Sequence, residues 1–169
     1  MKRSARYFVV AFLILSLPVF ANAEPGDADF DKGYDEFAAK NFDEAARYWR
    51  TAAQRGHIRA QNGLAVLLRD GDLGEPDKTQ AAFWFRKAAD AGYAYAMYSL
   101  GILYRDGEGV TQNDTQAYKW FFLASTINFD EKANFQKELL ARRMSGDQVE
   151  SAQNDAQGWI NNFFFGVAR

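Results

Sequence analysis

The sequence predicts an all-α fold, specifically a right-handed α-solenoid of about four antiparallel helix pairs. Three observations lead to this prediction. The chain repeats itself when it is shifted by 36 residues, apolar residues within each repeat recur at spacings of three and four, and glycines and capping residues separate the helical stretches. A stack of this kind builds its core from contacts between adjacent repeats.

The first 23 residues are predicted to be a secretory signal peptide rather than part of the fold. Lys2, Arg3 and Arg6 form a basic start, an apolar run follows over residues 7–15, and Ala21-Asn22-Ala23 matches the small-x-small pattern of a cleavage site. We expect cleavage after Ala23. An uncleaved anchor is the alternative, but the apolar run is shorter than the roughly 20 residues that cross a bilayer. Residues 24–28 are then a short linker, and residues 29–169 form a single domain.

Composition narrows the location and the class of partner. Without the three basic residues of the signal, 17 Lys and Arg stand against 22 Asp and Glu, a formal charge of −5. This balance argues against nucleic acid as a partner. The chain has no cysteine, so we expect neither a disulfide framework nor a lipidated amino terminus. We therefore expect a periplasmic or secreted protein that is not membrane-embedded after signal cleavage and is a monomer or a weak dimer.

The repeat is clearest between residues 57–92 and 93–128. Arg69-Asp70-Gly71 aligns with Arg105-Asp106-Gly107, and Trp84-Phe85 aligns with Trp120-Phe121, with no gap between these points. A further copy over residues 29–56 is recovered from its second half, where alanine and aromatic residues keep the spacing of the later copies. Its loop is four residues shorter, which predicts a tighter hairpin with helices over 29–40 and 43–55.

Capping signals divide each repeat into two helices. Asp77 and Asn113 begin sequences that resemble capping boxes and predict the starts of second helices. Gly71 and Gly107 sit where a left-handed residue would end the first helices.

After residue 128 the repeat fades, but helical patterns continue. We expect Asn128 to cap a helix that runs to about Arg143, and Ser145 with Gln148 to form a capping box that opens a last helix. Residues 129–165 are thus predicted to be capping helices, because a solenoid needs terminal elements that close its core.

The third repeat carries the fullest motif of the chain. It reads Ala96-x3-Leu100-Gly101-x2-Tyr104-x2-Gly107-x-Gly109-Val110, followed by Ala117-x2-Trp120-Phe121-x2-Ala124. This motif closely resembles the Sel-one-like repeat (SLR), a relative of the tetratricopeptide repeat. The preceding copy is degenerate, with Ala65 where the family prefers glycine and Leu73-Gly74 where Gly-Val is usual. The resemblance implies a superhelix that binds other proteins.

The sequence contains no convincing catalytic constellation. His57 is the only histidine, and directly after Gly56 it is better interpreted as a turn or capping residue than as a ligand or base. Without cysteine or a second histidine, the common zinc sites and the Cys-His nucleophile are out of reach. Closely spaced carboxylates could hold calcium or belong to a solvated loop, and their order does not match a known calcium loop. They are Asp70, Asp72, Glu75 and Asp77. We expect no enzymatic activity, no cofactor and no metal.

The concave face is the predicted partner-binding surface, because the first helices of stacked pairs line it. Family geometry places eight side chains there, with Tyr and Arg dominating, and these residue types are enriched at the energetic centres of interfaces. They are Tyr34, Phe37, Arg59, Asn62, Arg69, Tyr95, Tyr98 and Arg105. A second interpretation stays open for Arg69 and Arg105. Each precedes an aspartate at the same place in its repeat and could instead form a structural pair between repeats.

A second candidate surface lies near the end of the chain. Phe163, Phe164 and Phe165 are adjacent, so they cannot all face one side of a helix. The triplet either docks back onto the last helix pair or serves self-association or a partner contact.

The resemblance favours a non-enzymatic periplasmic adaptor or regulator that binds a protein partner from the cell envelope. Two alternatives from other classes are a hydrolase that acts on cell-wall or β-lactam substrates and a structural self-assembling envelope protein. Cysteine-rich members of the family have been linked to β-lactam binding, but this chain lacks their cysteines.

Overall fold

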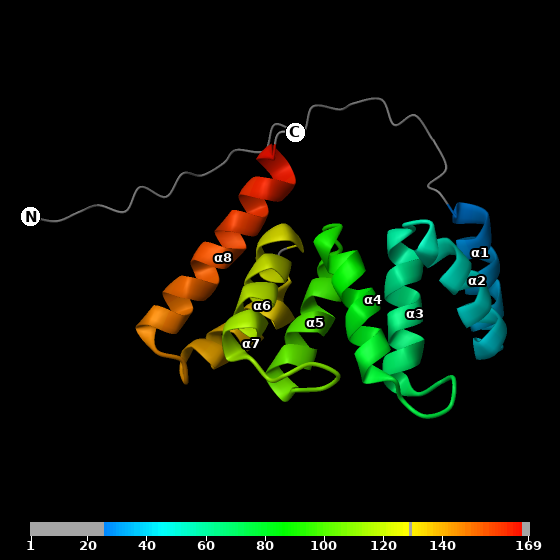
Figure 1. Ribbon diagram of the computed structural model, residues 1–169, viewed down its shortest axis with the longest axis horizontal. Helices are drawn as coiled ribbons and strands as arrows, with labels where there is room; N and C mark the ends of the chain where they lie inside the picture. Colours follow the sequence, from blue (N-terminus) through cyan, green and yellow to red (C-terminus); the bar gives the residue numbers. More distant parts are fainter. Residues whose placement is uncertain (1–25, 129, 167–169) are drawn as a thin grey trace, which may run out of the picture.

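The computed structural model describes residues 26–128 and 130–166, and within these ranges the chain forms eight α-helices and no strand (Figure 1). The all-α solenoid prediction is confirmed. The predicted signal peptide and its cleavage site lie outside the described residues. The helices are α1 (Asp27–Ala38), α2 (Phe42–Gln54), α3 (Ile58–Asp70), α4 (Lys78–Asp90), α5 (Ala94–Asp106), α6 (Asp114–Asn128), α7 (Glu131–Ala141) and α8 (Gly146–Phe165).

The capping residues mostly lie where the sequence places them. Gly71 and Gly107 end α3 and α5 with φ values of 80° and 71°, a conformation that glycine adopts without steric cost. Ser145 opens α8 with a complete capping box, in which its side chain and that of Gln148 each accept a backbone N–H. The cap of α7 was wrongly predicted. Asp130, not Asn128, accepts the backbone N–H of Ala133, at 2.9 Å, because α6 continues through residue 128.

The lone histidine has a structural role. His57 caps α3, since its Nδ1 accepts the backbone N–H of Ala60 at 3.1 Å. Its Nε2 lies 3.1 Å from Oδ1 of Asp27, and its ring stacks on Phe30 of α1 at 4.5 Å. The side chain is buried and ties the first helix to the third.

A ring packed against a glycine brings the two helices close together in the first and third helix pairs. The ring belongs to the eighth residue after the N-cap of the second helix, which is Trp49 or Phe121, and Phe85 takes this position in the second pair. A methyl group at Gly101 would lie 2.7 Å from Cε1 of Phe121, and one at Gly33 would overlap the ring of Trp49. The absence of a side chain at these glycines therefore lets the two helices of a pair approach closely.

The core forms two clusters that meet along α3 and α4. One is built on Trp49 and Leu64, and the other extends from Ala65 to α8. The half-buried side chains of Leu68 and Trp84 contact both clusters. Each repeat thus passes its apolar contacts to the next, as expected of a solenoid.

The last two helices are arranged differently. α7 lies against α6 as expected, but α8 makes its main contact with α6 rather than with α7. In Figure 1, α8 crosses the end of the stack at a slant. Both residues of the ring-to-small contact are missing here: Glu138 takes the position of Gly101, and Gln153 takes the position of Phe121. Two exposed polar side chains cannot replace a ring in a glycine notch, so α8 packs through Ala152 and Ala156 instead.

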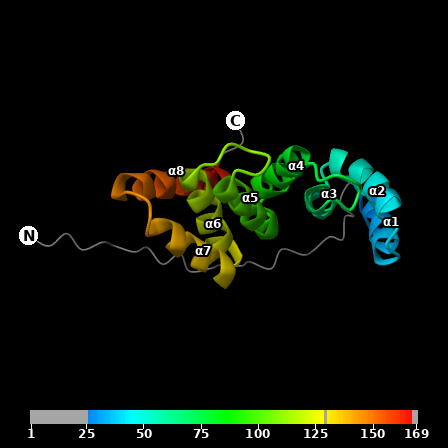
Figure 2. The same cartoon turned by 90° about the horizontal axis from the view of Figure 1, so that it is seen from below.

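The stack is curved. In Figure 2, α1, α3, α5 and α7 lie toward the concave side of the stack, and α2, α4 and α8 lie toward the convex side. Within the described residues, no helix combines the length and the apolar character needed to span a bilayer.

Candidate functional site

The helical register predicts a row of apolar side chains along the inner face of the stack. The inner helices are α1, α3, α5 and α7. Each contributes the residue directly after Gly33, Ala65, Gly101 or Glu138. One step along a helix turns that side chain about 100° away from the paired helix. We call this row the inner track: Tyr34, Val66, Ile102 and Leu139. Tyr34 and Leu139, on the two end helices, are exposed, and the two residues between them are half-buried.

Two further aromatic residues border the inner track. Tyr95 at the start of α5 is 61 % exposed, and Phe135 of α7 is 62 % exposed. Neither ring is needed to fill the core. Large exposed aromatics that gather with aliphatic residues on one surface are a mark of interaction sites.

Phe135 and Leu139 were missed by reasoning from the sequence. They correspond to Tyr98 and Ile102 when α7 is aligned to α5 with a shift of 37 residues, which superimposes the N-caps Tyr93 and Asp130. The extra residue relative to the period of 36 hid this correspondence. An alignment of the repeats that allows one inserted residue near position 129 reveals this correspondence.

Three of the predicted aromatic residues occupy different environments. Tyr34 is exposed on α1. Phe37 is half-buried and packs against Phe42 and Trp49 of its own helix pair, at centroid distances of 5.6 and 5.3 Å. Tyr98 is half-buried against Phe121, at 5.6 Å. Tyr34 is thus presented to solvent, whereas the other two rings also support the fold.

The two predicted arginines form ion pairs with their own neighbours. Arg69 donates two hydrogen bonds to Asp70, at 2.6 and 2.9 Å, and Arg105 donates two to Asp106, at 2.7 and 2.6 Å. Arg105 also donates to Oε1 of Gln136 on α7, at 2.7 Å, and so links two repeats. The hydrogen bonds from Arg105 lower the pKa of the Asp106 carboxyl below its ordinary value.

Arg59 and Asn62 lie on the first turn and a half of α3. The Arg59 guanidinium lies over the Phe30 ring, 4.5 Å from its centroid, while the residue as a whole is exposed. The Oδ1 atom of half-buried Asn62 has no hydrogen-bond partner among the described residues. Compared with α5 and α7, this part of the inner face is therefore more polar.

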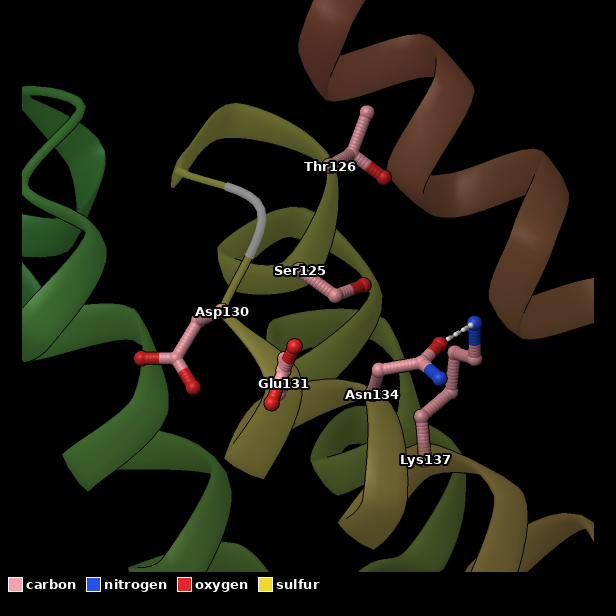
Figure 3. A pocket seen from close by; sticks show the side chains of 6 residues that line it. All are labelled: Ser125, Thr126, Asp130, Glu131, Asn134 and Lys137. Atoms are coloured by element: carbon pink, nitrogen blue, oxygen red, sulfur yellow. Dashed lines mark hydrogen bonds between the residues drawn. The ribbon is translucent and has the colours of Figure 1, made fainter.

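A polar hollow of about 620 Å³ lies where α6 passes into α7 (Figure 3). Lys137 donates to Asn134 at 2.7 Å, while Asp130 and Glu131 point to the other side of the hollow. The two hydroxyl groups at its rim, Ser125 and Thr126, both donate to the carbonyl of Phe122. Since both hydroxyls donate to a helix carbonyl, neither donates to a side-chain base that could activate it as a nucleophile.

The acidic loop after α3 does not gather its carboxylates around one point. Asp70 is bound by Arg69, and Asp77 caps α4 by accepting the backbone N–H of Gln80. Across residues 26–128 and 130–166, no group of three or more potential metal ligands converges.

Comparison with protein families explains this architecture. The model of the Sel1 repeat matches residues 31–57, 58–93 and 94–128, which together make up more than half of the chain. The chain belongs to the Sel1 repeat family. The resemblance predicted from the motif in the third repeat is thereby confirmed, and Sel1 repeats generally serve as protein-interaction scaffolds.

Two solved structures are similar to this Sel1 repeat protein. One is c5321, a protective antigen of uropathogenic Escherichia coli with an SLR fold, at a TM-score of 0.77 and 29 % identity over 82 % of this chain. This chain spans only 30 % of the c5321 chain. The other is a Sel1 repeat protein from Oxalobacter formigenes, at a TM-score of 0.61 and 32 % identity, which covers 67 % of this chain and 87 % of its own. Comparison with functionally curated proteins found no match.

Proposed function

We propose that this Sel1 repeat protein is a non-enzymatic adaptor or regulator of the periplasm that binds a protein partner on its inner face. The observation that carries the proposal is the inner track with Tyr95 and Phe135 beside it. The helical register turns these apolar groups toward the same side of the four inner helices, and the core uses them only in part. Burying such groups against a partner is favourable at about 25 cal/mol per Å².

The apolar surface of the inner face is concentrated on α5 and α7. Tyr95, Ile102, Phe135 and Leu139 all lie there, whereas Arg59 and Asn62 occupy the corresponding part of α3. The partner segment therefore places its apolar residues against the second half of the inner face. Arg105 borders this region, but its hydrogen bonds to Asp106 and Gln136 make it first of all a link between repeats.

Site-specific photocrosslinking in the native envelope tests the location of the binding surface. A photoreactive residue at position 95 or 135 should crosslink to a specific protein, and the same residue at position 83 should not. Phe83 is a matched control, because it is 50 % exposed and lies on α4, outside the inner row of helices. Equal crosslinking from positions 83, 95 and 135 would refute the inner face as the binding surface.

Loss of binding provides the second test. Tyr95→Ser with Leu139→Ser removes exposed apolar surface without opening the core, so circular dichroism and thermal stability should be unchanged while the crosslinked partner is lost. Phe83→Ser should retain the partner. A double variant that folds and binds normally would contradict the proposal.

Export rests on the predicted signal and has its own test. Amino-terminal sequencing of the protein from a periplasmic fraction should begin at Glu24, the residue after the predicted cleavage site. A chain that retains residues 1–23 and stays with the membrane would contradict this part of the proposal.

A further inference from the structure

The end of α8 carries an exposed aromatic cluster. Trp159 stacks on Phe163 at a centroid distance of 4.6 Å, Phe163 meets Phe164 edge-on at 5.0 Å, and Phe164 lies 6.4 Å from Phe165. We call these four residues the α8 cluster. The four rings follow one another from half-buried Trp159 to exposed Phe165, the last residue of α8.

One ring of the α8 cluster fixes the position of the others. A methyl group at Gly92 would lie 2.6 Å from Cζ of Phe163, so this ring packs directly on the turn between α4 and α5. Phe163 thereby anchors the end of α8 to the stack. Phe164 and Phe165 are held on the outside, at exposures of 57 % and 69 %.

The segment that carries the α8 cluster contains no charged residue. From Ala156 to Gly166 the chain has no acidic and no basic residue, although the whole chain has 20 basic and 22 acidic residues. A segment rich in aromatic residues and free of charged ones has the composition of the centre of a protein interface rather than that of a solvated helix end. The rest of α8 is acidic, with Asp147, Glu150 and Asp155.

We propose that the α8 cluster is a self-association surface through which two copies of this chain form a weak dimer. The charge pattern favours a second copy. Two molecules with the same net negative charge repel one another over most of their surface, and an uncharged aromatic patch is where they can approach. The acidic remainder of α8 disfavours the alternative occupant, an anionic lipid surface, which attracts basic segments.

The area of the patch sets the strength of the dimer. At roughly 200 Å² for a whole phenylalanine, the 45 %, 57 % and 69 % exposures of the three phenylalanines amount to about 340 Å². The exposed side chains of Gln157, Asn161 and Asn162 around them bring each copy to about 500 Å². Two such patches bury about 1,000 Å², the lower limit for a specific interface, so we expect a dissociation constant in the micromolar range or weaker.

Dimerisation would also affect partner binding. The α8 cluster and the inner track lie on different helices, so one dimer presents two free inner faces. Two linked binding sites raise the apparent affinity for a partner that is itself clustered in an envelope.

Sedimentation equilibrium of the purified chain tests the proposal. Between about 10 µM and 1 mM the wild type should shift from monomer to dimer, the range expected for an interface of this area. Phe164→Ser with Phe165→Ser should remain monomeric over the whole range, and Phe83→Ser should dimerise like the wild type. The double variant keeps Phe163 on Gly92, so its circular dichroism and melting temperature should match those of the wild type.

Three results would overturn the proposal. The first is a wild type that stays monomeric at all concentrations, and the second is a double variant that dimerises normally. The third is flotation of a monomeric wild type with vesicles of phosphatidylethanolamine and phosphatidylglycerol, lost in the double variant, which would assign the α8 cluster to a lipid surface.

Discussion

Replacing Gly101 with alanine should destabilise the protein, although the same change stabilises most helices. In α5 the new methyl group would lie 2.7, 2.8 and 3.1 Å from three ring atoms of Phe121, which is completely buried. Overpacking of this kind costs about 1–3 kcal/mol. Alanine regains up to about 1 kcal/mol through its higher helix propensity. The expected result is a net loss of up to about 2 kcal/mol.

Gly158→Ala is the matched control. Gly158 also lies inside a helix, but a methyl group at this position would meet nothing within 4 Å. Only the gain in helix propensity remains, so this variant should be more stable than the wild type by about 0.5–1 kcal/mol. The same substitution at two helical glycines should thus change stability in opposite directions.

Urea unfolding followed by circular dichroism measures both effects. A double-mutant cycle identifies the cause, because Phe121→Leu removes the ring atoms that the new methyl group meets. Gly101→Ala should then cost less in the Phe121→Leu background than in the wild type. If Gly101→Ala and Gly158→Ala stabilise the protein equally, or if the two changes at positions 101 and 121 are additive, the ring-to-glycine contact does not hold the pair together.

Three further predictions concern caps and charges. His57→Ala should lower stability by about 2–4 kcal/mol through loss of the cap on α3 and of the buried stack on Phe30, and His57→Asn should recover about 1 kcal/mol in thermal unfolding because asparagine also caps. Ser145→Ala breaks the capping box of α8 and should cost about 1 kcal/mol, which Ser145→Asp should largely restore in the same assay. Arg105 lowers the pKa of the Asp106 carboxyl below 3.8, so this ion pair stabilises the folded state above that pH, and the stabilisation is lost as the pH falls through the lowered pKa. Asp106→Asn should therefore be less stable than the wild type at pH 7 and equally stable in strong acid. A stability difference that persists in acid would count against the pairing.

Reasoning from the sequence worked best where the physical cause was local. The left-handed glycines at 71 and 107, the box at Ser145 and the capping role of His57 are all decided by residues within four positions of one another. The exception was the cap of α7. Asn128 and Asp130 are both good capping residues, and the sequence could not tell that the packing of α6 would carry that helix past the first of them.

The inner face was harder to predict. Tyr34 and Tyr95 are exposed, whereas Phe37 and Tyr98 also pack against their own helix pairs. Phe135 and Leu139 could be found only after α7 had been aligned with its one-residue shift. Which face of a helix is open depends on the neighbours that cover it, and those neighbours belong to other repeats.

The period of the stack, its helices and most of their ends follow from the sequence alone, because a repeated pattern of small and large residues allows neighbouring copies to pack in only one register. How the stack ends depends on tertiary packing. Glu138 and Gln153 deprive the last pair of its ring-to-small contact, so α8 lies on α6 and its aromatic end reaches Gly92. That choice depends on competition between two surfaces for one helix, which a linear pattern does not contain.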